Sequence, residues 1–367
     1  MRTIYTSCLM TIAALAVATS CGKSDTPTAA SGPVDVRLVV SSGDNTRVGS
    51  DATDNDIRQL RVYAFNAKGE KVGYAEADSL RGQNYIPITL SEGGDINFYV
   101  IANDNFGPRP TVGTTSVTDW ASLSKANLES LKFDLSRFTG WSATDDFVSP
   151  MSNNRYDEFG NELKNDSGTA AYKNDYGTAV TVTKPTVIPV TVQHVLGRLR
   201  LMLNKESDDV KISLKRAAVY NRPDYFLLYN SGSADIEYEK NESLVDEFVV
   251  SDIPLETTQK EVARTYLAPN LYGSSDPDTY NAQKTDGTST NGLNKAYCLE
   301  LTVEFAYTTG TSETKNYTED YTVYLPRVPR NTSIDVQGTF KGTVVKPEFN
   351  VMTEAWEEKV MNIPEFK

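Results

Sequence analysis

The sequence predicts an all-β protein, made mostly of strands with one or two short helices and arranged as two tandem β-sandwich domains. Three observations favour this fold class. The chain has 367 residues, which is enough for two domains that each bury a core. It contains 20 tyrosines and 23 glycines, together with many valines and threonines, a composition typical of strands and turns. Long apolar stretches with a 3.6-residue period, which would indicate helices, are few.

The first predicted strand spans residues 34–40. Asp35 and Arg37 lie on one of its faces, and the alternate positions form an apolar face made of Val34, Val36, Leu38 and Val40. A polar loop follows and exposes Arg47, at the kind of loop tip that proteases commonly cut. A cut there would free the strand from the rest of the chain. Burial of four such side chains is worth about 6 to 12 kcal/mol, so another segment would have to replace it.

Further strands are predicted wherever alternating apolar residues are bounded by turn residues. They lie at 57–65, 70–77, 85–90, 96–102, 178–183, 190–203, 210–220, 248–250, 263–268, 296–308, 317–325 and 332–342. One helix is predicted at 119–131, because Thr118 or Asp119 can cap it. Four apolar residues share one of its faces: Trp120, Leu123, Leu128 and Leu131.

The first twenty residues read as an export signal, because Arg2 precedes an apolar run at 9–17 and small residues precede Cys21. The run is too short to span a bilayer as a stable helix. A cysteine in this place is the usual attachment point for the acyl chains of bacterial lipoproteins, so we expect lipidation of Cys21. Ala18 stands where such signals more often carry leucine, which leaves cleavage by an ordinary signal peptidase as an alternative.

The expected division of the chain has five parts. Residues 1–20 are the signal peptide, and 21–47 are a lipidated propeptide that includes the first strand. The two domains follow at 48–185 and 186–345, with the boundary placed where Pro185 and Pro189 interrupt strand character. The tail, 346–367, holds two short strand-like pieces at 349–355 and 359–363, and it comes after the last strand that the second domain needs.

Composition and motifs argue against several chemical functions. The net charge of −13 and the small share of clustered basic residues make nucleic acid an unexpected partner. His194 is the only histidine and lies in a strand pattern, without a nucleophile motif nearby. Cys298 fits a small core residue, and acidic pairs such as Asp145 and Asp146 fit solvated loops. We therefore expect no enzyme activity, no catalytic residues, no metal and no cofactor.

Several short motifs, taken in order, are similar to those of one protein family. They are 57–65 with the turn 66–69, Phe-Tyr-Val-Ile-Ala-Asn at 98–103, Ser-Pro-Met-Ser at 149–152, Val-Leu-Gly-Arg-Leu at 195–199, Tyr-Leu-Ala-Pro-Asn at 266–270, and Val-Pro-Arg-Asn at 328–331 before Trp356. The chain in this respect resembles the fimbrillins, the lipoprotein precursors that build type V pili on certain Gram-negative bacteria.

The resemblance implies two β-sandwich domains of transthyretin-like type and an Arg-specific protease that removes the N-terminal strand at the outer membrane. Carried onto this sequence, Cys21 takes the lipid, Arg47–Val48 is the processing bond, and 34–40 is the strand removed. The tail of another subunit would then complete the sheet. The donor residues implied for that tail are Phe349, Val351, Trp356, Met361 and Ile363.

The expected function is that of a structural subunit, most simply in the stalk of a fimbria that supports adhesion. Its partners would be other copies or related subunits, the protease, and the outer membrane before processing, with host or bacterial surface ligands as further candidates. The precursor would be lipid-anchored at the outer membrane and the mature form would lie in the extracellular fimbrium. Two alternatives stay open: a tip or anchor subunit, and a lipid-anchored surface protein that binds glycans without polymerising.

Overall fold

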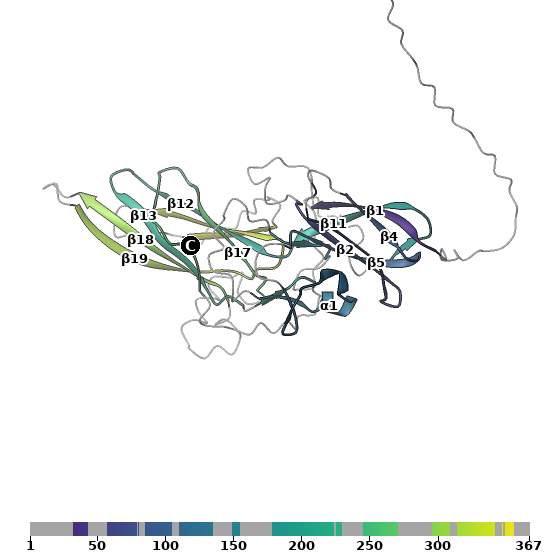
Figure 1. The fold of residues 1–367 in the computed structure, drawn as a ribbon. Helices are drawn as coiled ribbons and strands as arrows, with labels where there is room; N and C mark the ends of the chain where they lie inside the picture. The colour runs from purple at the N-terminus through teal and green to yellow at the C-terminus, as the bar shows by residue number, and fades with distance from the viewer. Residues whose placement is uncertain are drawn as a thin grey trace, which may run out of the picture.

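The regular structure of the described residues is almost entirely β-strand, which confirms the predicted fold class. The computed structural model shows two groups of sheets lying end to end (Figure 1). The residues that it describes are 32–42, 57–78, 80, 85–104, 110–134, 149–154, 178–223, 225–229, 245–270, 296–308, 314–341, 347 and 349–355. None of the helices within those ranges is long and apolar enough to cross a bilayer.

The first group is a sheet that folds over on itself around one apolar core. Its strand at one end, β4, packs over the strand at the other end, β3, so closely that a Cβ on Gly73 would lie 2.9 Å from the Leu90 side chain. This packing makes the first group a sandwich. The strand order is β3 (Lys71–Ala77), β2 (Leu60–Asn66), β5 (Gly94–Ala102), β9 (Met151–Ser152), β11 (Thr186–His194), β1 (Val34–Ser42) and β4 (Tyr85–Leu90), with β10 (Val180–Val182) beside β5.

The second group consists of two sheets that enclose a second core. One sheet has the order β17 (Lys260–Leu267), β12 (Gly197–Lys205), β20 (Thr332–Phe340) and β21 (Phe349–Ala355). The other has the order β15 (Asp246–Val249), β13 (Lys211–Tyr220), β18 (Cys298–Thr308) and β19 (Thr314–Tyr324), with β16 (Ile253–Pro254) beside β13. Leucines alternate along the facing strands, at 199, 201 and 203 on β12 and at 299 and 301 on β18, and all are buried.

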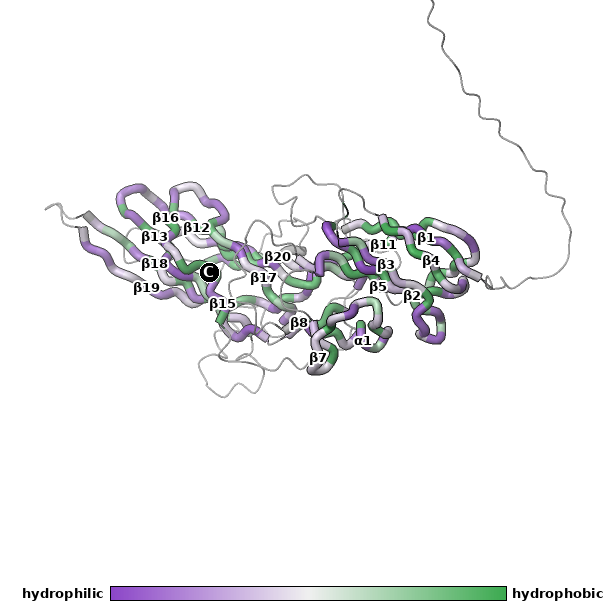
Figure 2. Tube along the Cα trace, in the orientation of Figure 1, coloured by the Kyte–Doolittle hydropathy of each residue, from purple (hydrophilic) through white to green (hydrophobic). Residues whose placement is uncertain are grey.

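Hydropathy follows this layering. In Figure 2 the interior strand β11 is mostly hydrophobic, whereas β19, at the edge of its sheet, is mostly hydrophilic. A strand flanked on both sides and covered on one face needs more apolar residues than an exposed edge strand.

A small third sheet joins the two groups. Its order is β14 (Tyr225–Leu227), β8 (Leu131–Asp134), β6 (Thr111–Val112) and β7 (Thr115–Ser116), so β14 comes from the second half of the chain and its partners from the first. Phe133 and Phe226 stack across the β8–β14 pair with ring centroids 4.9 Å apart. The aromatic core beneath them contains residues of both halves, including Tyr99 and Tyr229.

The single helix predicted at 119–131 is wrong. The chain instead forms a 3-10 turn, η1 (Trp120–Ser122), and a short helix, α1 (Lys125–Glu129). Ser124 causes the break, because its hydroxyl accepts a hydrogen bond from the Asn127 backbone N–H and starts a new helix. Leu131 is the first residue of strand β8, because its backbone pairs with Val112 of β6 in the third sheet.

The division at residues 185/186 stays a prediction, although one of its arguments fails. Pro189 does not interrupt a strand: it lies within β11, opposite Val39 of β1. β11 therefore belongs to the first sheet, and the chain crosses to the second group at 195–196, between β11 and β12. Proline is tolerated there because, among the described residues, the second partner of β11 is the short strand β9, which pairs with Gln193 and His194.

Candidate functional site

Strand β1 lies in the interior of the first sheet, although it comes from near the N-terminus. It runs parallel to β11, from Val36 opposite Thr186 to Ser42 opposite Val192. On its other side it runs antiparallel to β4, from Val34 opposite Leu90 to Val39 opposite Tyr85. Both edges of β1 are thus paired, as expected for a strand that completes a sheet.

The strand predicted at 34–40 is present and has one buried face. Its four alternate side chains have exposed fractions of 4%, 3%, 0% and 0%, in the order Val34, Val36, Leu38 and Val40. They pack in the first core against β4 and β11 side chains such as Ile88 and Ile188. The inner face of β1 is therefore a full part of the hydrophobic core.

The outer face of β1 makes weaker contacts. The Thr89 hydroxyl donates to an Asp35 carboxylate oxygen over 2.8 Å, and the Arg37 guanidinium lies 4.8 Å from the centre of the Tyr85 ring. Both pairs are near the surface, where such interactions contribute about 1 kcal/mol or less. The inner four side chains consequently dominate the energy that holds β1.

Removal of β1 would leave a groove in the sheet. Within the described residues, β4 has no ladder partner other than β1, and β11 would keep only its two-residue pairing with β9. The freed backbone N–H and C=O groups on both sides would need a replacement strand, because unpaired buried backbone groups are costly. The site is therefore a slot for one strand, with apolar walls and two hydrogen-bonding edges.

Strand β21 of the tail is held less firmly than β1. Among the described strands it pairs with β20 alone, from Gly338 opposite Phe349 to Thr332 opposite Ala355, and it is the last strand of its sheet. Phe349 and Val351 are only partly buried against the second core. The other residues singled out from the sequence, Cys21, Arg47, Val48, Trp356, Met361 and Ile363, lie outside the described residues.

Several of the sequence motifs meet at the junction between the two groups of sheets. The Ser152 hydroxyl and the Arg330 guanidinium both donate to the Leu228 carbonyl oxygen, each over 3.1 Å. The Asn331 backbone N–H donates to the Leu196 carbonyl oxygen over 3.2 Å. A Cβ on Gly197 would lie 2.5 Å from a Val328 methyl carbon, so only glycine fits there. These contacts hold the two groups of sheets together, and no pattern in the sequence predicted that Leu228, directly after β14, accepts two of them.

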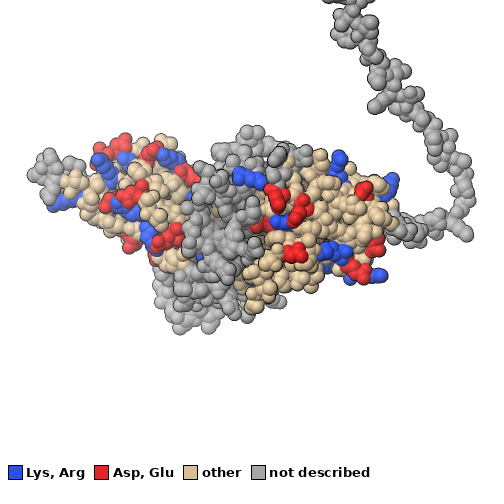
Figure 3. Space-filling model, in the orientation of Figure 1, with Lys and Arg blue, Asp and Glu red and all other residues tan. Residues whose placement is uncertain are grey.

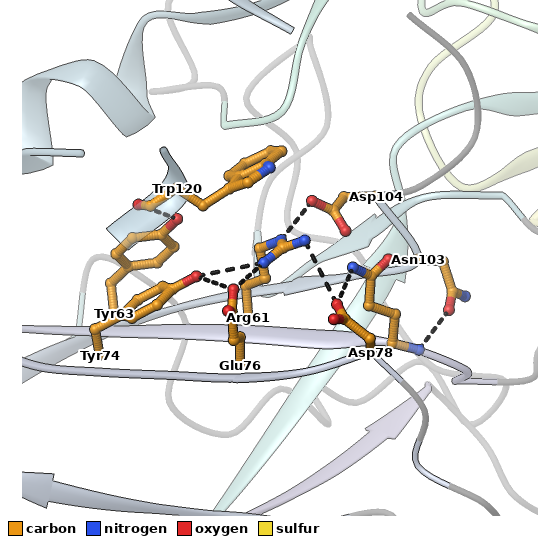
Figure 4. A network of polar contacts seen from close by, with 9 residues as sticks. Arg61, Tyr63, Tyr74, Glu76, Asp78, Asn103, Asp104 and Trp120 are labelled. Carbon is orange, nitrogen blue, oxygen red and sulfur yellow. Dashed lines mark hydrogen bonds and ion pairs between the residues drawn. The ribbon is translucent and has the colours of Figure 1, made fainter. Parts of the chain in front are cut away.

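A charged network fixes η1 to the first sheet (Figure 4). Arg61 of β2 donates through Nε to Asp104 Oδ2 over 2.6 Å and also pairs with Glu76, while its guanidinium lies 4.9 Å from the Trp120 ring. Burial raises the pKa of the Asp104 carboxyl, and the hydrogen bond from Arg61 opposes that rise. The Tyr63 hydroxyl donates to the Trp120 carbonyl oxygen over 2.9 Å. These contacts join β2 and β3 to η1.

His194 ends strand β11 and is 3% exposed. Burial lowers the pKa of its imidazole to about 3, with a smaller contribution from the nearby Arg198 guanidinium. The side chain is therefore neutral at physiological pH and lies in the interior, as expected for a structural strand histidine. Cys298 is half-buried at the first position of β18.

Acid should destabilise the protein through His194. Because the folded-state pKa is depressed, the unfolded chain binds a proton more readily between about pH 6.5 and 3, so stability falls as the pH is lowered through this window. We expect His194→Gln to remove this component, worth about 3 kcal/mol at pH 4. Urea unfolding of both proteins at pH 7 and pH 4 checks it; equal losses in the two proteins would contradict the assignment.

Charged side chains of both signs are mixed on the surface. Figure 3 shows basic and acidic groups interspersed over the drawn face, and Lys215, for example, lies 3.0 Å from a Glu304 carboxylate oxygen. Within the part of the chain that the structure describes, no three acidic, histidine or cysteine side chains gather in a way that could hold a metal ion. The strand slot that β1 fills is thus the candidate functional site of the described residues.

Known proteins show similarity at the level of family and fold. A family model described as "Major fimbrial subunit protein (FimA)" matches residues 33–216, half of the chain. No match was found among curated proteins. The chain is similar to a "putative cell adhesion protein" of Parabacteroides distasonis ATCC 8503, with a TM-score of 0.52 and 11% identity over 91% of this chain and 99% of that one.

Two further solved structures are less similar. The tip fimbrial protein Mfa3 of Porphyromonas gingivalis has a TM-score of 0.47 and 14% identity over 88% of this chain and 100% of that one. A fimbrilin of P. gingivalis W83 has a TM-score of 0.46 and 13% identity over 87% of this chain and 96% of that one. On the family match, the chain belongs to the FimA family of major fimbrial subunit proteins, structural components of the cell-surface fimbrium that assemble with other fimbrial subunits.

Proposed function

We propose that this protein is a stalk subunit of a type V fimbria and that it polymerises by strand exchange. In this proposal a protease cuts after Arg47, β1 leaves the first sheet, and the tail of another copy takes its place. The observation that carries the proposal is the position of β1: an interior strand, paired on both sides, that ends five residues before Arg47 in the sequence. Its removal creates a vacancy without removing any other strand.

The direction of the strands supports the exchange. β1 and β11 are parallel, and β11 leads directly into β12, so the Val34 end of β1 faces away from the second group of sheets. β20 is parallel to β12, so its Phe340 end faces away from the first group. The tail leaves β20 at that far pole. If the tail turned outward, it would enter the next subunit with the same N-to-C direction as β1. It could then form the same pattern of backbone hydrogen bonds with β4 and β11 that β1 forms.

The spacing of the tail also suits the slot. β21 has the alternating pattern Phe349, Val351, Thr353 and Ala355, which matches the four inward positions of β1 in number and period. Met361 and Ile363 fall on the same alternate positions as Phe349 and Val351 and would extend the apolar face, whereas Trp356 would lie on the opposite face of a regular strand. A replacement strand of this kind is bound by β-strand addition, in which backbone hydrogen bonds give affinity and the alternate side chains give specificity.

The remaining parts of the proposal concern the route to the fimbrium. Cys21 carries the lipid that holds the precursor at the outer membrane, and the cut at Arg47–Val48 releases the subunit for assembly. The protein acts as a structural component and as part of an adhesive fibre, without enzyme activity. A stalk position fits best, since a stalk subunit needs both an acceptor slot and a donor tail.

Treatment of the purified full precursor with an Arg-specific protease tests the function. We expect a mature N-terminus at Val48 and a ladder of oligomers that resists mild SDS, because exchanged strands are buried core elements. A cut protein that stays a stable monomer would overturn the proposal and favour a surface glycan-binding protein. A surface-assembled form that still begins at Cys21 would overturn the stalk assignment and favour an anchor.

A further inference from the structure

The tail strand β21 is seated on a gap in the side-chain pattern of β20. The inward positions of β20 carry Ile334, Val336, Gly338 and Phe340, so a glycine interrupts a run of large apolar residues. Phe349, the first residue of β21, is paired with this glycine. A Cβ on Gly338 would lie 2.8 Å from Phe349 Cε1 and 2.9 Å from Cδ1, closer than real Cβ contacts allow. The phenyl ring therefore occupies the space that a side chain would take.

Gly338 is required by this close approach and not by its backbone conformation. Its φ lies outside the left-handed region, unlike that of Gly69, so alanine could adopt the same backbone there. Another reason for glycine is thus needed, and the Phe349 ring supplies it. The Leu203 side chain bounds the same space, at 3.2 Å from the added Cβ.

Aromatic side chains surround the seated ring. The Phe349 centroid lies 5.8 Å from that of Tyr321 and 5.9 Å from that of Phe340, at interplanar angles of 62° and 75°. Such edge-to-face pairs are favourable beyond simple area burial. We refer to Gly338, Tyr321 and Phe340 as the glycine seat. It is contributed by β19 and β20, and it binds a side chain of an edge strand whose only described ladder partner is β20.

The glycine seat lies where the tail would have to turn. Phe349 follows directly on the 341–348 connection, next to the far end of β20, whereas Ala355 lies at the other end of the strand. A tail that swings outward about this connection must lift the ring from the seat. The second half of β21 can separate from β20 without doing so.

We propose that the glycine seat retains the donor tail on its own subunit and thereby sets the rate of donation. This inference rests on the proposed strand exchange. Before assembly, Phe349 in the seat keeps β21 on β20 and out of reach of other copies. The tail becomes available to another subunit when the Phe349 ring leaves the glycine seat. The device restrains premature assembly at the donor end, as the uncut β1 restrains it at the acceptor end.

The test uses the full precursor and replaces the seat instead of the tail, so that the donor sequence stays intact. Gly338→Ala pushes the ring out, while Gln337→Ala, at the adjacent position on the opposite face of β20, is the matched control. Hydrogen exchange in residues 349–353 of the uncut protein should be about tenfold faster or more in Gly338→Ala, because overpacking of this size is costly. After the Arg-specific cut, the half-time of ladder formation should shorten, whereas Gln337→Ala should match the wild type in both measurements.

A general loss of stability is separated by exchange in β13, which lies in the other sheet of the second group and should be unchanged. Phe349→Ala is a second check, because it should free the tail in the uncut protein without altering β20. Equal tail exchange in Gly338→Ala and Gln337→Ala overturns the proposal. Faster tail exchange in Gly338→Ala with an unchanged half-time of ladder formation also overturns the proposal. If the wild type forms no ladder after the cut, the proposed function is wrong, and the glycine seat has no role in assembly. This holds even if hydrogen exchange shows that Gly338→Ala releases the tail.

Discussion

Arg47→Gln should abolish assembly completely while the precursor stays folded. The change removes the basic side chain that an Arg-specific protease needs, so β1 remains covalently joined to the rest of the chain. With β1 in place, both the β4 and β11 edges are occupied and no incoming strand can pair. The treated variant should show no SDS-resistant ladder on a gel and no new N-terminus at Val48, whereas the wild type should show both.

Arg37→Gln is the matched control for this experiment. Arg37 lies within β1, where the backbone on both sides is hydrogen-bonded, and a protease needs an extended and accessible segment. Loss of its contact with Tyr85 should change stability by about 1 kcal/mol or less. Cutting and assembly of Arg37→Gln should therefore match the wild type. Ladder formation by Arg47→Gln, or its loss in Arg37→Gln, would show that the processing bond is elsewhere.

Leu38→Ala should lower the free energy of unfolding of the precursor by about 2 to 5 kcal/mol. Leu38 is 0% exposed and occupies the middle of β1, so its truncation leaves a cavity between β4 and β11. The same loss should make the strand leave faster once the loop is cut, and assembly of Leu38→Ala should be faster than that of the wild type. Urea unfolding of the uncut precursor measures the first effect, and the half-time of ladder formation measures the second.

Val39→Ala is the matched control for this effect. Val39 is the next residue along β1, but it lies on the outer face and is only half-buried. Its truncation should change stability by no more than about 1 kcal/mol. Similar losses in Leu38→Ala and Val39→Ala would mean that the inner face does not dominate the energy that holds β1.

Local pattern was enough to predict most strands. Alternation predicted residues 85–90 and 349–355 with the bounds that the structure gives for β4 and β21, because edge strands keep a clear period of two. The pattern at 34–40 also predicted which face of β1 is buried. For the candidate site, sequence alone indicated the strand and the tail. The glycine in β20 was a readable signal as well, since it interrupts an apolar alternation, but its meaning depends on Phe349, which arrives from another strand.

Long-range contacts account for what the sequence could not predict. Residues 225–229 are not a regular apolar alternation, yet they pair with β8 and receive the Arg330 and Ser152 hydrogen bonds from distant segments. The helix expected at 119–131 was overridden in the same way, because Leu131 is needed in the third sheet. Pro189 suggested a strand boundary, because the sequence does not reveal that most of β11 pairs with β1 on one side and with no described strand on the other.

The double pairing of β1 has a consequence for the order of events in assembly. Hydrolysis of one peptide bond near Arg47 breaks none of the contacts between β1 and its neighbours. A freshly cut subunit therefore still has β1 paired with β4 and β11. The cut is therefore necessary for the exchange but does not by itself remove β1 from the sheet. The tail of another subunit must begin to pair at the Val34 end and displace β1 one residue after another. Growth of the fibre would then depend on this displacement at the acceptor as well as on release of the donor tail, and a cut subunit without an incoming tail would keep its core closed to water.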